Sequence, residues 1–325
     1  MFANRKFLAA GAAALALGLS AAAAQAQTWI MASGYPEDNF LTQNIRLFIE
    51  EVEANTDLTI DLQSNDTLIK LDAIKTAVQR GQVPMGEIRL GVYGNEDPMY
   101  ILAGVPFLAP TYEDAWRLKE AQKPYFAEKL EAAGLMVLFY QPWPGQGFYT
   151  KTPVETLADF EGKKLRIYST ATQKMGEMLG FQATILPFAE IPQAFSTGLI
   201  EALFTSPQTG IDIQAWDNTD HFTYAGAIYS KNAVIVNKAM FDGLPEDTRT
   251  AILNAASLAE ERAWKMSAET TEAQIGILAQ NGMTTTEAPE PIMARMREIG
   301  KTMVEDWRAT ASPEAIAVLD AYLAE

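Results

Sequence analysis

The amino-acid sequence predicts an α/β protein of two lobes with a ligand cleft between them. Strands and helices alternate through residues 28–93, and the same alternation restarts after Gln141. The proline-free stretch 246–280 favours one long helix that can connect the two lobes. We therefore expect two lobes, each with its own sheet, joined by hinge strands and a long connecting helix.

The first 26 residues have the composition of a secretory signal peptide. Arg5 and Lys6 give a basic start, an apolar run rich in Ala and Gly follows, and Ala24-Gln25-Ala26 supplies the small residues that a signal peptidase recognises. A membrane anchor is the alternative, but no comparable apolar run follows. We expect export to the periplasm and a mature chain that begins near Gln27.

Charge and residue counts exclude several classes of function. With Arg5 and Lys6 removed, 23 basic residues remain against 41 acidic ones, a net charge near −18. Nucleic acid is not an expected partner, because binding it requires a basic surface. The chain has no cysteine and one histidine, so we expect no cofactor and no zinc or iron site, whereas calcium is less firmly excluded.

Hydrophobic periodicity defines the elements of the first lobe. Five apolar residues have helical spacing within 39–56, and 58–64 alternates like a strand. The expected elements, in chain order, are a strand at 28–35, a helix at 39–56, a strand at 58–64, a helix at 68–81 and a strand at 85–93. This β-α-β-α-β order implies right-handed crossovers and a largely parallel sheet.

The second lobe repeats the alternation, and the tail is helical. The expected elements are strands at 134–141, 164–170, 181–187 and 202–207, helix-like segments at 155–160, about 171–179 and 191–201, strand-like segments within 225–245, a long helix at 246–280 and two helices after Pro289. After a signal peptide at 1–26, we assign 27–143 plus about 232–270 to the first lobe and 144–231 plus about 271–325 to the second.

Signatures of catalysis are scarce. His221 has no serine elbow or cysteine to partner it, and the sequence contains no G-x-S-x-G, H-E-x-x-H or Walker motif. We therefore do not expect an enzyme. A periplasmic enzyme on the two-lobed fold is the least favoured alternative.

Two arginines lie inside apolar strands of an acidic chain. Leu165 and Ile167 share one face of their strand, which places Arg166 and Tyr168 on the other, and Arg89 lies within "EIRLGVY" in the first lobe. One interpretation is that each arginine pairs with an internal acid, such as Glu190 for Arg166. The alternative is a bound carboxylate, which the planar guanidinium matches with paired donors.

Residues 152–207, "TPVETLADFEGKKLRIYSTATQKMGEMLGFQATILPFAEIPQAFSTGLIEALFTSP", resemble the signature region of tripartite ATP-independent periplasmic (TRAP) transporter solute-binding proteins, the DctP-like family. The residues that carry the resemblance are Pro153, Leu157, Asp159, Gly162, Lys164, Arg166, Gly180, Glu190, Ala194, Gly198 and Glu201. The earlier segment "ILAGVPFLAPTYEDAWRL" is similar to the family's first-lobe pattern, so the resemblance spans nearly the whole mature chain.

The resemblance implies a periplasmic-binding-protein-like receptor that closes on a small organic acid. Such a receptor delivers the acid to the small and large integral-membrane subunits of a permease, which an ion gradient drives without ATP. Arg166 falls on the family's carboxylate-binding arginine, and Phe188 falls where an aromatic residue often stands beside it. We expect a monomer. A receptor that feeds a membrane sensor or chemoreceptor is the alternative, since the same cleft would serve it.

Departures from the family pattern bear on the ligand. Gln146 stands where many members carry a second arginine, Pro192 replaces a tyrosine, and Glu201-Ala202 replaces Asp-Gly. Arg89 lies near a position that is acidic in sialic-acid receptors, so sialic acid is disfavoured. The acid is either a hydroxy, keto or aromatic monocarboxylate, with Gln146 contacting a neutral group, or a diacid whose second acidic group binds Arg89.

The candidate ligand-binding residues come from both expected lobes and include polar, aromatic and basic side chains. They are Arg166, Arg89, Gln146, Phe188, Tyr168, Ser206, Lys70, Ser33, Tyr35 and Trp216.

Overall fold

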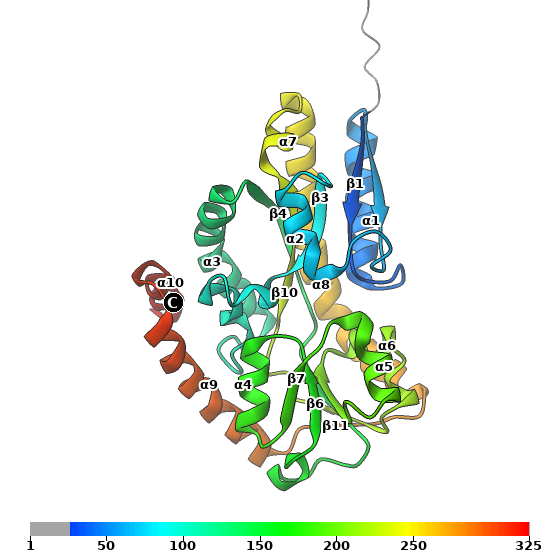
Figure 1. Cartoon of the computed structure of the whole chain (residues 1–325), viewed down its shortest axis with the longest axis vertical. Helices are drawn as coiled ribbons and strands as arrows, with labels where there is room; N and C mark the ends of the chain where they lie inside the picture. The colour runs from blue at the N-terminus through cyan, green and yellow to red at the C-terminus, as the bar shows by residue number, and fades with distance from the viewer. Residues whose placement is uncertain (1–26, 325) are drawn as a thin grey trace, which may run out of the picture.

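Two β-sheets, one in each lobe, organise the chain in the computed structural model, which describes residues 27–324 (Figure 1). The expected signal peptide, residues 1–26, lies outside the described residues. The mixed α/β architecture with two lobes confirms the predicted fold class. None of the helices in the described part of the chain is both long and apolar enough to cross a membrane.

The first lobe is built on a five-stranded sheet in the order β2-β1-β3-β10-β4. Its strands are β1 (Gln27–Ala32), β2 (Leu58–Gln63), β3 (Met85–Arg89), β4 (Leu135–Pro142) and β10 (Lys231–Asn237). β1 pairs in parallel with β2 and β3, as the β-α-β order predicts, but β10 runs antiparallel to both β3 and β4. The expectation of a largely parallel sheet therefore holds for only three of the five strands.

The second lobe is built on a six-stranded sheet in the order β11-β9-β5-β8-β6-β7. Its strands are β5 (Gly147–Thr150), β6 (Lys164–Ile167), β7 (Gln182–Ile185), β8 (Ala202–Thr205), β9 (His221–Tyr224) and β11 (Thr284–Glu287). The chain crosses from β4 into β5 through residues 143–146 and returns from β9 to β10 through residues 225–230. Two segments therefore connect the lobes where the sequence predicts hinge strands, but neither segment is a strand in the structure.

Ten α-helices and several 3-10 turns cover the sheets within the described residues (Figure 1). The helices are α1 (Phe40–Asn55), α2 (Ile74–Gln79), α3 (Tyr112–Ala132), α4 (Thr170–Met178), α5 (Ile191–Ser196), α6 (Pro207–Asp212), α7 (Lys238–Asp242), α8 (Glu246–Gln280), α9 (Glu290–Thr310) and α10 (Pro313–Ala324). The 3-10 turns used below are η1 (Leu71–Ala73), η2 (Leu90–Tyr93), η3 (Pro98–Gly104), η5 (Phe188–Glu190) and η6 (Ala215–Asp217).

Two expected elements of the first lobe are shorter than predicted. The helix expected at 68–81 is only η1 followed by α2, because Asn65 and Asp66 have positive φ and the Asp66 carboxylate accepts a hydrogen bond from Leu71 N. The strand expected at 85–93 ends at Arg89, where the chain turns into η2. Arg89 is therefore the last residue of its strand rather than a residue in the middle.

The 35-residue helix α8 packs against both lobes, as the sequence predicts. It contacts α1 and β4 in the first lobe and α6 and β11 in the second. After it, α9 packs against α4, and α10, which our expected lobe limits assign to the second lobe, packs against α3. The expected lobe limits remain a prediction.

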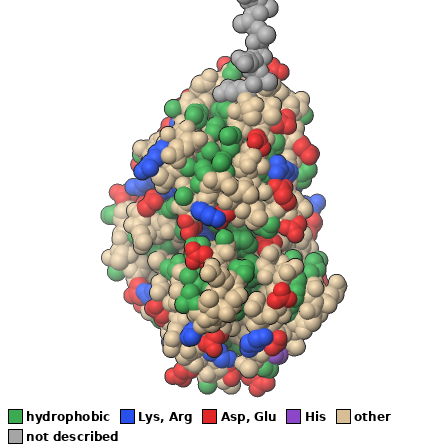
Figure 2. All heavy atoms as spheres, turned by 45° about the vertical axis from the view of Figure 1, so that its right-hand side comes forward, with side chains coloured by type: hydrophobic (Ala, Val, Ile, Leu, Met, Phe, Trp, Pro, Cys, Tyr) green, Lys and Arg blue, Asp and Glu red, His purple; other side chains and the backbone are tan. Residues whose placement is uncertain are grey.

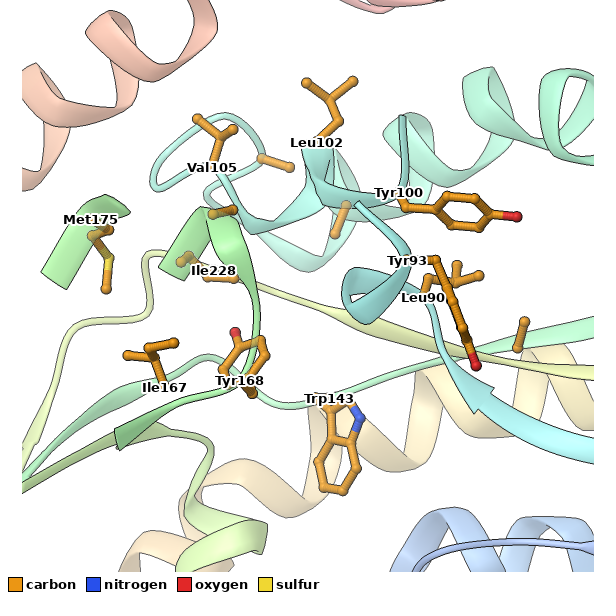
Figure 3. Packing of buried hydrophobic residues seen from close by; sticks show 14 of the residues in the cluster. Leu90, Tyr93, Tyr100, Leu102, Val105, Trp143, Ile167, Tyr168, Met175 and Ile228 are labelled. Atoms are coloured by element: carbon orange, nitrogen blue, oxygen red, sulfur yellow. The ribbon is translucent and has the colours of Figure 1, made fainter. Parts of the chain in front are cut away.

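The largest apolar cluster is continuous across the two lobes, as Figure 3 shows. Leu90, Tyr93 and Val105 belong to the first lobe and share this cluster with Tyr168 and Met175 of the second. The approach is close, since a Cβ added at Gly104 would lie 3.1 Å from the Ala171 Cβ in α4. The structure therefore represents the closed arrangement of the lobes.

Candidate functional site

A small cavity lies between the two lobes. Its lining residues come from both sheets and both crossing segments and are Tyr35, Arg89, Trp143, Gln146, Arg166, Tyr168, Phe188, Thr205, Ser206, Thr209 and Ser230. The free space between these side chains is narrow, so the cavity fits only a ligand with few heavy atoms.

Arg166 is the most deeply buried cation of this cavity. Leu165 and Ile167 are fully buried beneath it, and the Arg166 side chain donates from Nε and Nη2 to the Leu186 carbonyl at 3.1 and 2.9 Å. Arg166 is 1% exposed, and no carboxylate of the described residues lies within 4 Å of its guanidinium, Glu190 included. The alternative of an internal ion pair for Arg166 is therefore wrong.

The guanidinium of Arg166 remains cationic. Burial, with a contribution from Arg89, lowers the pKa of Arg166 to about 9, which leaves the group charged at neutral pH. A buried cation without an anionic partner is energetically costly. Because Nε and Nη2 bind one carbonyl, this contact fixes the plane of the guanidinium and leaves Nη1 without a hydrogen bond among the described residues.

Arg89 is a second buried cation with incomplete pairing. Its Nε is buried without a hydrogen-bond partner among the described residues, and its Nη2 lies 3.7 Å from Oδ1 of Asp72, a half-exposed residue. The Cζ atoms of Arg89 and Arg166 lie 5.5 and 5.9 Å from the centre of the Tyr168 ring. Two guanidinium groups thus approach one aromatic ring from the two lobes, which makes the cavity a site for an anion.

A chain of neutral hydrogen bonds forms one wall of the cavity. The Tyr168 hydroxyl donates to Oε1 of Gln146 at 2.5 Å, and Nε2 of Gln146 donates to Oγ of Ser230 at 3.0 Å. Burial raises the pKa of Tyr168 to about 12, so this hydroxyl keeps its proton. Gln146 retains one N–H and one lone pair for another partner.

The start of α6 supplies three hydroxyl groups to the cavity, from Thr205, Ser206 and Thr209. Ser206 is the N-cap of α6, and its Oγ accepts a hydrogen bond from Thr209 N at 3.2 Å. The buried Tyr149 hydroxyl donates to the Ser206 carbonyl at 3.0 Å. These contacts hold the β8–α6 junction in place beside the cavity.

Aromatic rings from both lobes and a crossing segment form another wall of the cavity. The ring of Tyr35 packs edge-on against Trp143 and Phe188, with centroids 4.9 and 5.5 Å apart. Trp143 Nε1 in turn donates to Oδ1 of Asn232 at 2.9 Å, which fixes the indole plane. The ligand site is therefore a cationic pocket with an aromatic wall.

A buried carboxylate lies behind this aromatic wall. Glu87 is fully buried and accepts hydrogen bonds from Ser33 Oγ at 2.5 Å, Gln141 Nε2 at 2.7 Å and Asn232 Nδ2 at 2.8 Å. Burial raises the pKa of Glu87, and these three donors oppose the shift. Because Asn232 also binds Trp143, Glu87 supports the position of a cavity wall without lining the cavity.

Seven of the ten residues singled out from the sequence line the cavity, and three do not. The seven are Arg166, Arg89, Gln146, Phe188, Tyr168, Ser206 and Tyr35. The Lys70 side chain is 76% exposed and 3.9 Å from Asp66, whereas Ser33 is buried and bound to Glu87. Trp216 lies in η6 and packs in a separate apolar cluster of the second lobe.

Four further cavity residues were not singled out from the sequence, namely Trp143, Thr205, Thr209 and Ser230. Trp143 and Ser230 lie in the crossing segments, and the two threonines flank the β8–α6 junction. A rule of thumb could have found the threonines, because polar residues after the carboxyl end of a strand often form ligand sites in α/β sheets. No local signal marks Trp143 or Ser230.

Comparison with known proteins agrees with this geometry. Residues 31–310 match the family described as "Bacterial extracellular solute-binding protein, family 7", DctP. The chain belongs to this family. Its members are extracytoplasmic solute receptors that work with membrane permeases, which confirms the resemblance to TRAP solute-binding proteins.

Three relatives of this family 7 receptor are informative. DctP7 of Bordetella pertussis, an extracytoplasmic solute receptor binding pyroglutamic acid, is 41% identical, with 91% of this chain and 99% of that chain covered and a TM-score of 0.89. A TRAP solute-binding protein specific for pyroglutamate, from an unidentified microbe of a marine metagenome, is 35% identical. The match covers 93% of this chain and 100% of that chain, with a TM-score of 0.89. The C4-dicarboxylate-binding periplasmic protein DctP of Rhodobacter capsulatus is 27% identical, with 85% of this chain and 84% of that protein covered.

Proposed function

We propose that this receptor binds a small monocarboxylate of the pyroglutamate type and delivers it to a TRAP permease. The observation that carries the proposal is the buried Arg166 guanidinium, which has no acidic partner among the described residues. The bound acid would supply the missing carboxylate. The two solved relatives that bind pyroglutamate, at 41% and 35% identity, support this choice of acid.

The chemistry of the cavity suits a cyclic amide acid. Pyroglutamate combines one carboxylate, one amide N–H, one carbonyl and a compact apolar ring. Its carboxylate would bind Arg166, and its amide would face the neutral groups of Gln146 and the α6 hydroxyls. The aliphatic ring would pack against Phe188 and Trp143. A neutral amide needs no second counter-charge, which agrees with the glutamine at position 146.

The location, oligomeric state and partners of the receptor are part of the same proposal. We infer that the receptor works as a periplasmic monomer, without enzymatic activity, and contacts both the small and the large permease subunit. Acidic side chains are spread over the face in Figure 2, with fewer basic ones between them, which agrees with the negative net charge. Delivery to a membrane sensor or chemoreceptor is not favoured, because the relatives are transport receptors.

Calorimetric titration with L-pyroglutamate tests the proposal. We expect saturable binding of one molecule per chain. We also expect mass spectrometry to identify pyroglutamate in the extract of freshly purified protein after denaturation. L-Proline is the matched control: it keeps the ring and the carboxylate but replaces the amide with a cationic amine, which two arginines disfavour. Failure of pyroglutamate to bind the folded protein contradicts the proposed ligand.

A diacid is the second candidate, and Arg89 is the observation that favours it. The Arg89 Nε has no partner among the described residues, and its contact with Asp72 is longer than a hydrogen bond. A ligand with two acidic groups could bind one arginine in each lobe. Tighter binding of succinate than of pyroglutamate would select this candidate.

Replacing Arg89 by glutamine measures what the first-lobe cation contributes. We expect pyroglutamate binding to weaken by roughly 3- to 30-fold, because the variant loses an attraction screened by the protein rather than a paired hydrogen bond. For a diacid, the loss should exceed roughly 100-fold, since one acidic group would be left buried and unpaired. Titration of the folded variant with both acids distinguishes these results. Unchanged affinity for both would mean that Arg89 serves only Asp72.

A further inference from the structure

The short helix α6 connects the ligand cavity to a contact between the lobes. Its N-terminal end carries Ser206 and Thr209 into the cavity, and its last residue is Asp212. Figure 1 shows α6 and the start of α1 on the same side of the molecule, one in each lobe. Because α6 has only about one and a half turns, a rigid displacement of this helix would change both the ligand cavity and the contact between the lobes.

Asp212 is held across the lobe interface by an amide. Nδ2 of Asn39 donates to Oδ2 of Asp212 at 2.7 Å, while Nε2 of Gln208 donates to Oδ1 at 2.6 Å. Asn39 is fully buried and is also the N-cap of α1, since its Oδ1 accepts a hydrogen bond from Leu41 N at 2.9 Å. One side chain thus begins a helix of the first lobe and binds a carboxyl group of the second.

The surroundings of Asp212 contain no neutralising cation. No lysine or arginine of the described residues lies within 4 Å of its carboxyl group. The titratable groups that act on it are Asp38, beside Asn39, and the buried Tyr149 hydroxyl of β5. From α8, the neutral Gln274 donates to Oε1 of Gln208 at 2.8 Å and so supports the Gln208 side chain.

We propose that the Asn39–Asp212 contact is a latch that forms when the lobes close over the ligand and that makes ligand affinity depend on pH. The latch adds to the receptor function proposed above and rests on it, because the ligand brings the lobes together. Asp212 is a positioning residue in this proposal. It touches no ligand and acts through α6 and the hydroxyls at the start of that helix.

The sign of the pH dependence follows from burial. Desolvation raises the pKa of Asp212 to about 7 in the closed form, with Asp38 adding to the shift and the two amides opposing it. In an open form that exposes the group, the pKa returns to about 3.9. Closure then takes up a proton between these values. Affinity is highest at low pH, falls as pH rises toward about 7, and is level above that.

Three variants distinguish loss of the Asn39–Asp212 contact from a general loss of stability. Asn39→Ser keeps a good N-cap for α1 but is too short to reach Asp212. Asp212→Asn keeps the size of the group but removes its titration. Asp212→Ala, combined with Asn39→Ser, completes a double-mutant cycle for the contact.

Titration with L-pyroglutamate between about pH 5 and about pH 8 tests the latch. The wild-type affinity should fall about tenfold or more over this range, while Asp212→Asn should change less than about twofold. The ligand carboxyl stays ionised throughout, because an α-carboxyl titrates near about 3.5. The combined Asn39→Ser and Asp212→Ala variant should bind no more weakly than either single variant. An equal pH slope in Asp212→Asn, or fully additive losses, would overturn the proposal.

A measurement without ligand keeps the test independent of the proposed acid. The chain has no cysteine, so spin labels on cysteines introduced at Leu68 and Leu199, both about half exposed, report one inter-lobe distance. We expect the closed fraction of the ligand-free protein to rise as pH falls from about 8 to about 5 in wild type and to stay constant in Asp212→Asn. A pH-independent distance distribution in wild type would reject the latch, whether or not pyroglutamate binds.

Discussion

Replacing Arg166 by alanine is expected to weaken binding of the acid by roughly 30- to 3,000-fold. The guanidinium is 1% exposed, fixed by the Leu186 carbonyl, and without an acidic partner among the described residues. Truncating one partner of a buried charge pair costs about 2–5 kcal/mol, because the other charge is left buried and unpaired. At about 1.4 kcal/mol per tenfold change, this cost gives the stated range. Calorimetric titration of the folded variant measures it.

Arg166→Lys is the matched control. It keeps the positive charge but loses the paired, planar donors, so we expect it to recover only part of the affinity. Removing Arg166 also relieves an uncompensated buried charge, so the ligand-free alanine variant should be no less stable in thermal unfolding than the ligand-free wild type. An affinity within about threefold of wild type in folded Arg166→Ala would show that Arg166 does not bind the acid.

Replacing Glu87 by alanine is expected to lower the free energy of unfolding by about 3–5 kcal/mol. Three buried donors, on Ser33, Gln141 and Asn232, would lose their common acceptor. A buried donor left without a partner costs about 1–3 kcal/mol, and partial relaxation keeps the total below the sum. Urea unfolding, monitored by tryptophan fluorescence, measures this change in the free energy of unfolding from the midpoint urea concentration and the slope of the free energy against urea.

Glu87→Gln distinguishes the hydrogen-bond network from the charge. The amide keeps an acceptor for Gln141 and Asn232, and the Ser33 hydroxyl can turn to accept from the new NH₂ group. We expect a loss of about 1 kcal/mol or less at neutral pH, because the amide also avoids an ionised group in a dry site whose pKa is raised by burial. A loss as large as that of Glu87→Ala would show that the negative charge itself is required.

Local patterns in the sequence predict the elements and the principal arginine well. Alternation in "KLRI" places Leu165 and Ile167 in the core and Arg166 at the cavity, as the structure shows. The family resemblance points to the same residue. Arg89 was identified for the same reason, although it is the last residue of its strand and its side chain also approaches Asp72.

Long-range pairing explains what the sequence could not predict. Strand β10 inserts antiparallel between β3 and β4, and this register alone brings Asn232 beside Glu87 and Trp143. No local spacing encodes such a contact between residues more than 80 positions apart. Ser33 was misplaced for a related reason, because its hydroxyl donates to a buried carboxylate instead of facing the cavity.

The length of α8 has a mechanical consequence. A helix of 35 residues spans about 52 Å, and α8 is fixed to both lobes by packing at its two halves. Between these halves, the hydroxyls of Thr270 and Thr271 donate hydrogen bonds to the carbonyls of Met266 and Ser267, respectively. The Tyr112 hydroxyl also donates to the Ser267 carbonyl. Such side-chain bonds loosen and bend a helix locally. Because α8 packs against both lobes, a change in the angle between the lobes requires α8 either to bend or to repack against one of them.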